Sequence, residues 1–136
     1  MQFVQQHAFN IAAALLVGWM LWRRLIAPRL SGVKTISASE YLQQMRDQAH
    51  TLVDVRQPGE WQSGHAKAAV HIPLGEVAGR MHEIPQDKPV VVICASGNRS
   101  AMAATRLAKA GFSSVYNFSG GMGAWQSAGL PVQSGD

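Results

Sequence analysis

From about residue 36 onward, short apolar runs alternate with longer stretches in which apolar and polar residues mix. The apolar runs predict strands at residues 51–55, 70–73, 90–93 and 115–118, of which 51–55 and 90–93 read as buried. The mixed stretches predict helices at 37–48, 75–83, 101–110 and 122–127, with a turn or short helix at 57–61. Strands that alternate with helices predict an α/β domain, with a mainly parallel sheet and helices on both faces.

Local signals support two of these helices and point to a site. Ser37 and Glu40 have the spacing of a capping box, which predicts that a helix starts there. Gly111 follows the 101–110 segment, as expected of a glycine that ends a helix. In parallel sheets of this kind, ligands bind at the carboxyl ends of the strands. Cys94 stands at that end of the 90–93 strand.

A separate apolar segment precedes the domain. Residues 8–22 read AFNIAAALLVGWMLW, with Asn10 the only strongly polar residue. A helix of this length rises about 22 Å, against roughly 30 Å for a hydrocarbon core, and extension back to residue 3 gives about twenty residues. Trp19 and Trp22, followed by two arginines, have the pattern of an interfacial anchor. We therefore predict one transmembrane helix over residues 3–26, with an interfacial helix or a buried helix of the domain as alternatives.

The predicted transmembrane helix determines the expected domain boundaries and the expected cellular location of the protein. Residues 1–27 are the expected anchor, 28–35 a linker and 36–134 the folded domain. No lysine or arginine precedes the apolar run and no small-residue cleavage site follows it, which argues against a secretory signal peptide. Because the basic residues follow the run, the positive-inside rule places the domain in the cytoplasm. We expect a single-pass protein of the cell membrane, which is the inner membrane in a bacterium.

Charge and cysteine content narrow the function classes. The net charge of +4 belongs to residues 1–34, whereas basic and acidic residues balance in 35–136. The domain has no basic surplus, so we expect no nucleic-acid partner. Cys94 is the single cysteine, which excludes an internal disulfide framework and a multi-cysteine metal site. His65 and His71 lack metal-ligand spacing, and we predict neither a metal nor a cofactor.

Cys94 opens a loop of small residues between a strand and a helix. Ala95, Ser96, Gly97 and Asn98 separate it from Arg99, so several backbone amides can point at one spot. These amides and the positive end of the helix dipole are expected to favour the thiolate. Arg99 adds a guanidinium suited to oxyanions. A thiolate in such a cradle serves attack on phosphorus or attack on sulfur.

The order of several motifs over roughly residues 35–132 resembles that of a single-domain rhodanese, a sulfurtransferase. The motifs are Asp54-Val55-Arg56 with Glu60, Gly64-His65, Cys94-x-x-Gly97-x-Arg99-Ser100, Gly120-Gly121 with Trp125, and Gly129-Leu130-Pro131-Val132. The arginine follows the cysteine by five positions, as in rhodanese-type loops. Tyrosine-phosphatase-type loops place it at six, where this chain has serine.

The resemblance implies that a sulfane sulfur passes from a donor such as thiosulfate or a persulfide to Cys94, and then to a thiol, cyanide or protein acceptor. The implied substrate-binding residues are Ala95, Ser96, Gly97, Asn98, Arg99 and Ser100. Asp54 and Arg56 would form a structural ion pair or organise the site, with Glu60 as the expected partner of Arg56. Ala95 stands where many thiosulfate-active relatives have a basic residue, which argues against thiosulfate as the preferred donor.

A second class of function stays open, namely a membrane-tethered, non-catalytic module that binds a partner and senses redox state through the thiol. The intact loop argues against it, because binding-only relatives often lose the cysteine. Turnover with a thiol acceptor distinguishes the two.

Overall fold

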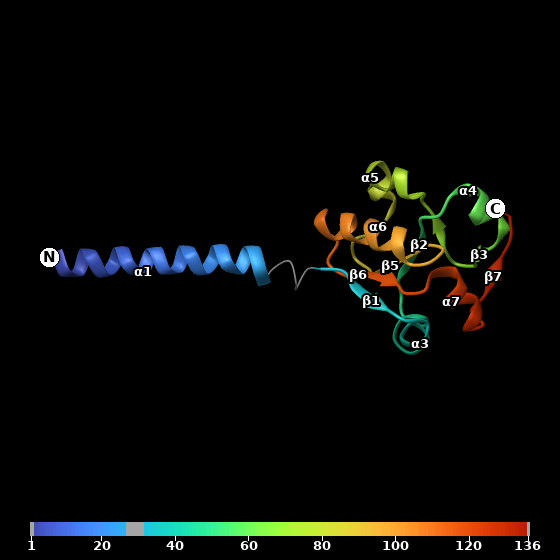
Figure 1. Cartoon of the computed structure of the whole chain (residues 1–136), viewed down its shortest axis with the longest axis horizontal. Helices are drawn as coiled ribbons and strands as arrows, with labels where there is room; N and C mark the ends of the chain where they lie inside the picture. The colour runs from blue at the N-terminus through green and yellow to red at the C-terminus, as the bar shows by residue number, and fades with distance from the viewer. Residues whose placement is uncertain (1, 27–31, 136) are drawn as a thin grey trace. The chain divides into compact units, whose positions relative to one another are not determined.

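The computed structural model describes residues 2–26 and 32–135. The chain divides into two compact units, Met1–Gly32 and Val33–Asp136 (Figure 1). The first unit consists of helix α1 (Gln2–Leu21), which continues into the π-helical turn η1 (Trp22–Ile26). Residues 28–31 of the predicted linker lie outside the described residues, and its last two residues belong to strand β1 (Lys34–Ile36).

The prediction of a membrane-spanning helix over residues 3–26 is not supported. Within residues 2–26 and 32–135, no helix combines the length and the apolar character that crossing a bilayer requires. Gln5, Gln6, His7 and Asn10 interrupt the first half of α1. The stretch from Ile11 to Leu21 rises only about 16 Å, roughly half of a hydrocarbon core. The anchor, and the membrane location and orientation deduced from it, therefore have no support in the described residues.

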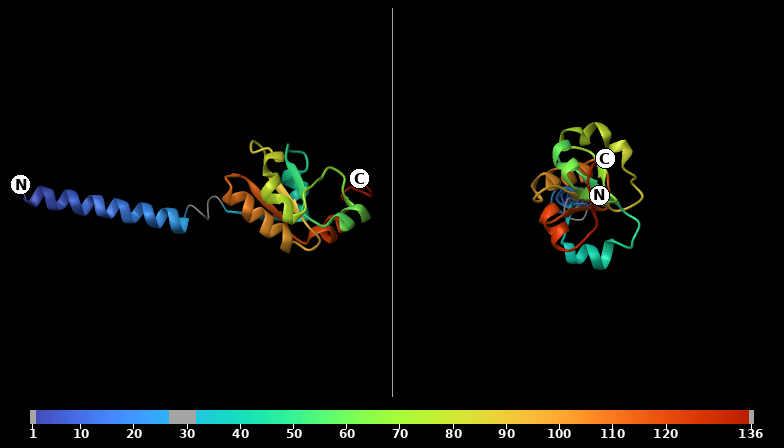
Figure 2. Two further views of the ribbon diagram at one scale, coloured as in Figure 1. Left: turned by 90° about the horizontal axis from the view of Figure 1, so that it is seen from above. Right: turned by 90° about the vertical axis from the view of Figure 1, so that its right-hand side faces the viewer.

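A five-stranded parallel sheet, in the order β1-β6-β5-β2-β4, forms the centre of the second unit (Figures 1 and 2). The remaining strands of this sheet are β2 (Thr51–Asp54), β4 (Val70–His71), β5 (Val90–Ile93) and β6 (Val115–Phe118). A separate antiparallel pair joins β3 (His65–Ala66) to β7 (Val132–Gln133). The predicted α/β fold with a mainly parallel sheet is confirmed.

Helices cover both faces of this sheet, as predicted (Figure 1). One face carries α6 (Asn98–Lys109) and the segment formed by η3 (Leu74–Glu76), α5 (Val77–Arg80) and η4 (Met81–Glu83). The other face carries α3 (Ala38–Glu40), η2 (Tyr41–Met45) and α7 (Gly121–Ser127). The predicted capping box opens α3, since the Ser37 hydroxyl accepts from the Glu40 amide and the Glu40 carboxylate accepts from the Ser37 amide, both at 3.1 Å.

Strand β5 lies in the middle of the sheet and is buried along its whole length. Successive strand residues face opposite sides. Val90, Val92 and Cys94 therefore belong to the apolar cluster that includes α5 and α6, whereas Val91 and Ile93 belong to the cluster that includes α7. Full burial of each such side chain contributes about 2 kcal/mol. The thiol of Cys94 thus faces the α6 side, at the carboxyl end of the central strand.

The first residue of α7 packs directly against the loop that follows β5. Gly121 has a φ of +57°, and a Cβ placed there would overlap the carbonyl groups of Cys94 and Ala95. The next amide, of Met122, donates to the Cys94 carbonyl at 2.9 Å. Only glycine combines this backbone conformation with such a close approach. The start of α7 therefore fixes the backbone on which the thiol is mounted.

We predict that Gly121→Ala destabilises the second unit by about 2–4 kcal/mol, since it adds backbone strain and a clash at one position. Gly123→Ala in the same helix is the matched control, because a Cβ there meets nothing within 4 Å. Alanine in a helix is expected to stabilise by up to about 1 kcal/mol over glycine. The free energy of unfolding in urea measures both changes. Equal effects at the two positions would contradict the close packing.

Candidate active site

Cys94 is fully buried, and its sulfur lies within the turn of the loop. The Gly97 amide donates to Cys94 Sγ at 3.0 Å, and Ser100 Oγ lies 3.2 Å from the same sulfur. Gly97 has a φ of +104°, a left-handed conformation that favours glycine and turns the amide back toward the sulfur. Ala95, Ser96 and Asn98 are exposed on the outer side of the loop. The loop therefore encloses the sulfur with backbone groups rather than with large side chains.

The pKa of Cys94 lies below the ordinary value of a thiol. Burial raises this pKa, but hydrogen bonds outweigh burial. They come from the Ser100 side chain and from the backbone N–H groups of Ser100, Gly97 and Ser96. The lowered pKa of Cys94 agrees with the prediction from the sequence that the loop favours the thiolate. The Ser100 hydroxyl contributes more than any single amide, which the loop pattern did not reveal.

Asn117, on β6, is a site residue that sequence reasoning missed. Its Nδ2 donates to the Gly97 carbonyl at 3.2 Å, which orients the amide so that Oδ1 accepts from the Ser100 hydroxyl at 2.5 Å. A hydroxyl has one hydrogen, so Asn117 Oδ1 and Cys94 Sγ compete for it. When sulfur is a thiol, Ser100 donates to Asn117 and accepts from sulfur. When sulfur is a thiolate, the hydrogen can turn to the charge.

Arg99 binds a carboxylate of the protein itself. Its Nη1 and Nη2 donate to the two carboxylate oxygens of Glu60 at 2.7 and 2.9 Å. Glu60 lies in α4 (Pro58–Ser63) and also accepts from the Gln57 amide at 3.1 Å. The Arg99 hydrogen bonds are the main reason that the pKa of Glu60 falls to about 2. The expectation that Glu60 pairs with Arg56 is therefore wrong.

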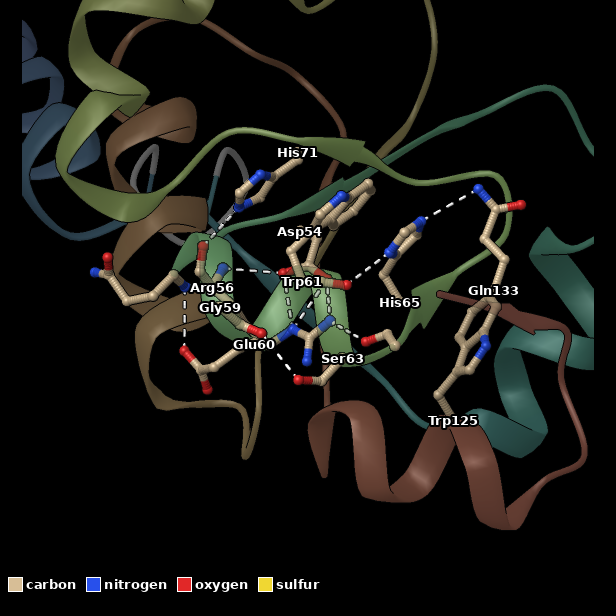
Figure 3. A network of polar contacts seen from close by, with 12 residues as sticks. Asp54, Arg56, Gly59, Glu60, Trp61, Ser63, His65, His71, Trp125 and Gln133 are labelled. Carbon is tan, nitrogen blue, oxygen red and sulfur yellow. Dashed lines mark hydrogen bonds and ion pairs between the residues drawn. The ribbon is translucent and has the colours of Figure 1, made fainter. Parts of the chain in front are cut away.

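Arg56 pairs instead with Asp54, in a buried ion pair at the end of β2 (Figure 3). The Arg56 Nε donates to both Asp54 oxygens at 3.0 Å, and Nη2 donates to Oδ2 at 2.8 Å. Nη2 also donates to the Gly64 carbonyl at 2.7 Å, which ties β2 to the turn before β3. Loss of one partner would leave the other charge buried and alone, a cost of about 3–5 kcal/mol. These contacts favour the structural role for Asp54 and Arg56.

Trp61 of α4 stacks between two histidines, as Figure 3 shows. Its ring centroid lies 3.5 Å from that of His65 and 4.7 Å from that of His71, with nearly parallel planes. His65 Nδ1 lies 2.8 Å from the Trp61 carbonyl, and His71 Nε2 donates to the Arg56 carbonyl at 2.8 Å. The stack fixes α4 on the sheet, and with it the carboxylate that binds Arg99.

A hollow of about 430 Å³ lies elsewhere on the second unit. Its walls are mainly apolar and aromatic, with Arg46 and Lys67 among the lining residues. None of residues 94–100 lines it, so it is distinct from the site around the thiol.

Comparison with known proteins agrees with this geometry. Residues 37–128 match the model of the rhodanese-like domain. The chain is 41% identical to the thiosulfate sulfurtransferase GlpE of Pseudomonas syringae, over 64% of this chain and 82% of that protein. It is 38% identical to the putative sulfur carrier protein YrkF of Bacillus subtilis, over 70% of this chain but only 52% of that relative, so it spans about half of YrkF.

Solved structures show the same fold. The rhodanese-related protein of Thermoplasma volcanium matches with a TM-score of 0.66 and 34% identity, over 74% of this chain and 97% of that one. A rhodanese-like domain protein of Staphylococcus aureus matches with a TM-score of 0.65 and 28% identity, over 75% and 100%. The chain belongs to the rhodanese-like domain family, as its motifs predict.

We predict that Ser100→Ala raises the pKa of Cys94, with an acid dissociation constant about fivefold lower, since a lost hydrogen bond of roughly 1 kcal/mol has that effect. Ser96→Ala is the matched control, because Ser96 acts on the sulfur through its backbone amide, which alanine keeps. Titration of the ultraviolet absorbance of the thiolate measures both variants. A Ser100→Ala titration curve that overlays the wild-type curve would contradict a role for the hydroxyl.

Proposed function

We propose that the second unit is a sulfurtransferase that carries sulfane sulfur on Cys94 as a persulfide. The observation that carries this proposal is the hydrogen bonding of Cys94 Sγ by the Gly97 amide at 3.0 Å, beside the Ser100 hydroxyl at 3.2 Å. Such donors stabilise an anionic sulfur without a charged partner. Membership of the rhodanese-like family, and 41% identity to a protein named thiosulfate sulfurtransferase, support the same reaction.

The reaction has two balanced steps. In the first, the Cys94 thiolate attacks the outer sulfur of the donor, and a bond forms between Sγ and that sulfur. The sulfur–sulfur bond of the donor breaks, and its electron pair leaves with sulfite from thiosulfate or with a thiolate from a persulfide. In the second, a thiol or cyanide attacks the outer sulfur, and Cys94 leaves as thiolate. The protein ends as it began, so the electrons balance without an outside oxidant.

Each loop residue has a proposed part in this cycle. The amides of Ser96, Gly97 and Ser100 hold the charge on sulfur, whether it resides on Sγ or on the added atom. Ala95 and Asn98 are exposed beside these amides and would contact the donor or acceptor. The remaining three site residues would support the loop without contacting the reacting sulfur. Arg99 binds Glu60, and the ion pair of Asp54 and Arg56 holds the end of β2.

We predict that incubation of the full chain with a small persulfide, a polysulfide or thiosulfate adds the mass of one sulfur atom to the wild type and none to Cys94→Ser. A thiol or cyanide should then remove the added mass and release thiol persulfide or thiocyanate. Intact-protein mass spectrometry measures both steps.

The control for the donor chemistry is thiol without sulfane sulfur, which should add nothing that cyanide removes. Absence of the adduct with all three donors would refute the proposal. Loading without discharge to any acceptor would instead favour the non-catalytic sensing module.

A further inference from the structure

The two arginines of the site, Arg99 and Arg56, each form an ion pair with a carboxylate of the protein. Arg99 is the only cation in residues 94–100, and its two terminal nitrogens bind Glu60. Arg56 binds Asp54 through Nε and Nη2. The two ion pairs cancel, so the thiolate stands among side chains that add no net positive charge. Ala95, next to the nucleophile, supplies none either.

The Glu60 carboxylate occupies the position on Arg99 that the oxygens of an anionic donor would take. The two carboxylate oxygens meet the two terminal nitrogens at 2.7 and 2.9 Å, which is the bidentate geometry that a guanidinium offers to oxyanions. Glu60 and Arg99 are 36% and 32% exposed, respectively, whereas Cys94 is fully buried. An anion that approaches Arg99 from solvent therefore meets a negative charge beside it.

This carboxylate is held firmly in place. The Gln57 amide donates to Glu60 Oε1, and the neighbouring Trp61 is stacked between His65 and His71. With a pKa of about 2, Glu60 stays charged near neutral pH. Displacing it from Arg99 would require a donor to break both hydrogen bonds. A donor whose reacting end has no oxyanion does not face that competition.

We propose that Glu60 determines the donor specificity of this protein. By binding Arg99, it disfavours oxyanion donors such as thiosulfate and leaves persulfides and polysulfides as the preferred class. The inference rests on the proposed function, because it assumes that Cys94 accepts sulfane sulfur. It makes Glu60 a positioning and specificity residue, since Glu60 acts on the donor through Arg99.

Glu60→Gln tests the proposal, because glutamine keeps the size of the side chain and an oxygen that can accept from the Gln57 amide, but removes the charge. We expect the rate constant for Cys94 persulfide formation with thiosulfate to rise about tenfold, as release of a charge-assisted contact allows. The rate constant with 2-hydroxyethyl persulfide should stay within about twofold, because that donor has no carboxylate or other oxyanion for Arg99 to bind. Quenched reactions followed by intact-protein mass measure both rates.

Glu76→Gln is the matched control. Glu76 is also an exposed carboxylate bound to an arginine, Arg80 at 3.3 Å, but it lies on η3 and its arginine is not part of the loop. It should leave both rate constants unchanged. Combining Glu60→Gln with Arg99→Gln should abolish the gain with thiosulfate. If Glu60→Gln fails to fold, as judged by circular dichroism, Glu60→Ser gives the same comparison.

The outcomes separate the two proposals. Suppose that the wild type accepts sulfur from the persulfide, and that Glu60→Gln leaves the ratio of the thiosulfate and persulfide rate constants unchanged. This result overturns the specificity role alone. Equal gains for Glu60→Gln and Glu76→Gln overturn it as well, since long-range charge would then explain both. A wild type that accepts sulfur from no donor overturns the specificity role together with the proposed function.

Discussion

The packing of α7 against the loop that follows β5 is the contact on which the rest of the site depends. Gly121 sits on the carbonyl groups of Cys94 and Ala95, and the Met122 amide binds the first of them. This contact fixes the direction in which the chain leaves β5, and hence the turn at Gly97 whose amide meets the sulfur. The electrostatics of the thiol therefore follow from a backbone contact made more than twenty residues away in sequence.

Hydrogen-bond dipoles are the main stabilisation of the anionic sulfur, although the Arg99 guanidinium also attracts it. The backbone amides and the Ser100 hydroxyl lower the pKa of Cys94 although burial opposes them. Both nearby arginines bind carboxylates, one buried and one partly exposed. Backbone amides can bind an anion without the matched pair of oxygens that a guanidinium favours. This division of roles suits the anionic sulfur of the proposed reaction.

The elements set by local sequence could be predicted, and those set by distant pairing could not. The apolar run at 90–93 became β5 with the predicted bounds, because valine and isoleucine suit a strand that is buried on both faces. Residues 115–118 became β6, also with the predicted bounds. Strand β1 was missed, since only Ile36 of its three residues is buried and its partner β6 is about eighty positions away.

In the site, too, contacts between residues that are distant in sequence could not be predicted. The turn of the loop toward Cys94 followed from its small residues, but the partner of Arg99 did not, because Glu60 is 39 positions distant and lies closer in sequence to Arg56. Asn117 carried one signal that was overlooked: it is a polar residue in a strand, paired in register with Val92 beside the site. The predicted membrane helix lacks support for a different reason. The aromatic and basic flanks of α1 are typical of an anchor, but polar residues interrupt its first half.

The complete burial of the only cysteine in the chain limits what its sulfur can be joined to. A covalent bridge between two copies would require their Cβ atoms to come within about 4 Å, which an enclosed side chain does not permit while the fold is intact. The proposed persulfide on Cys94 would therefore form without crosslinking two copies of the chain.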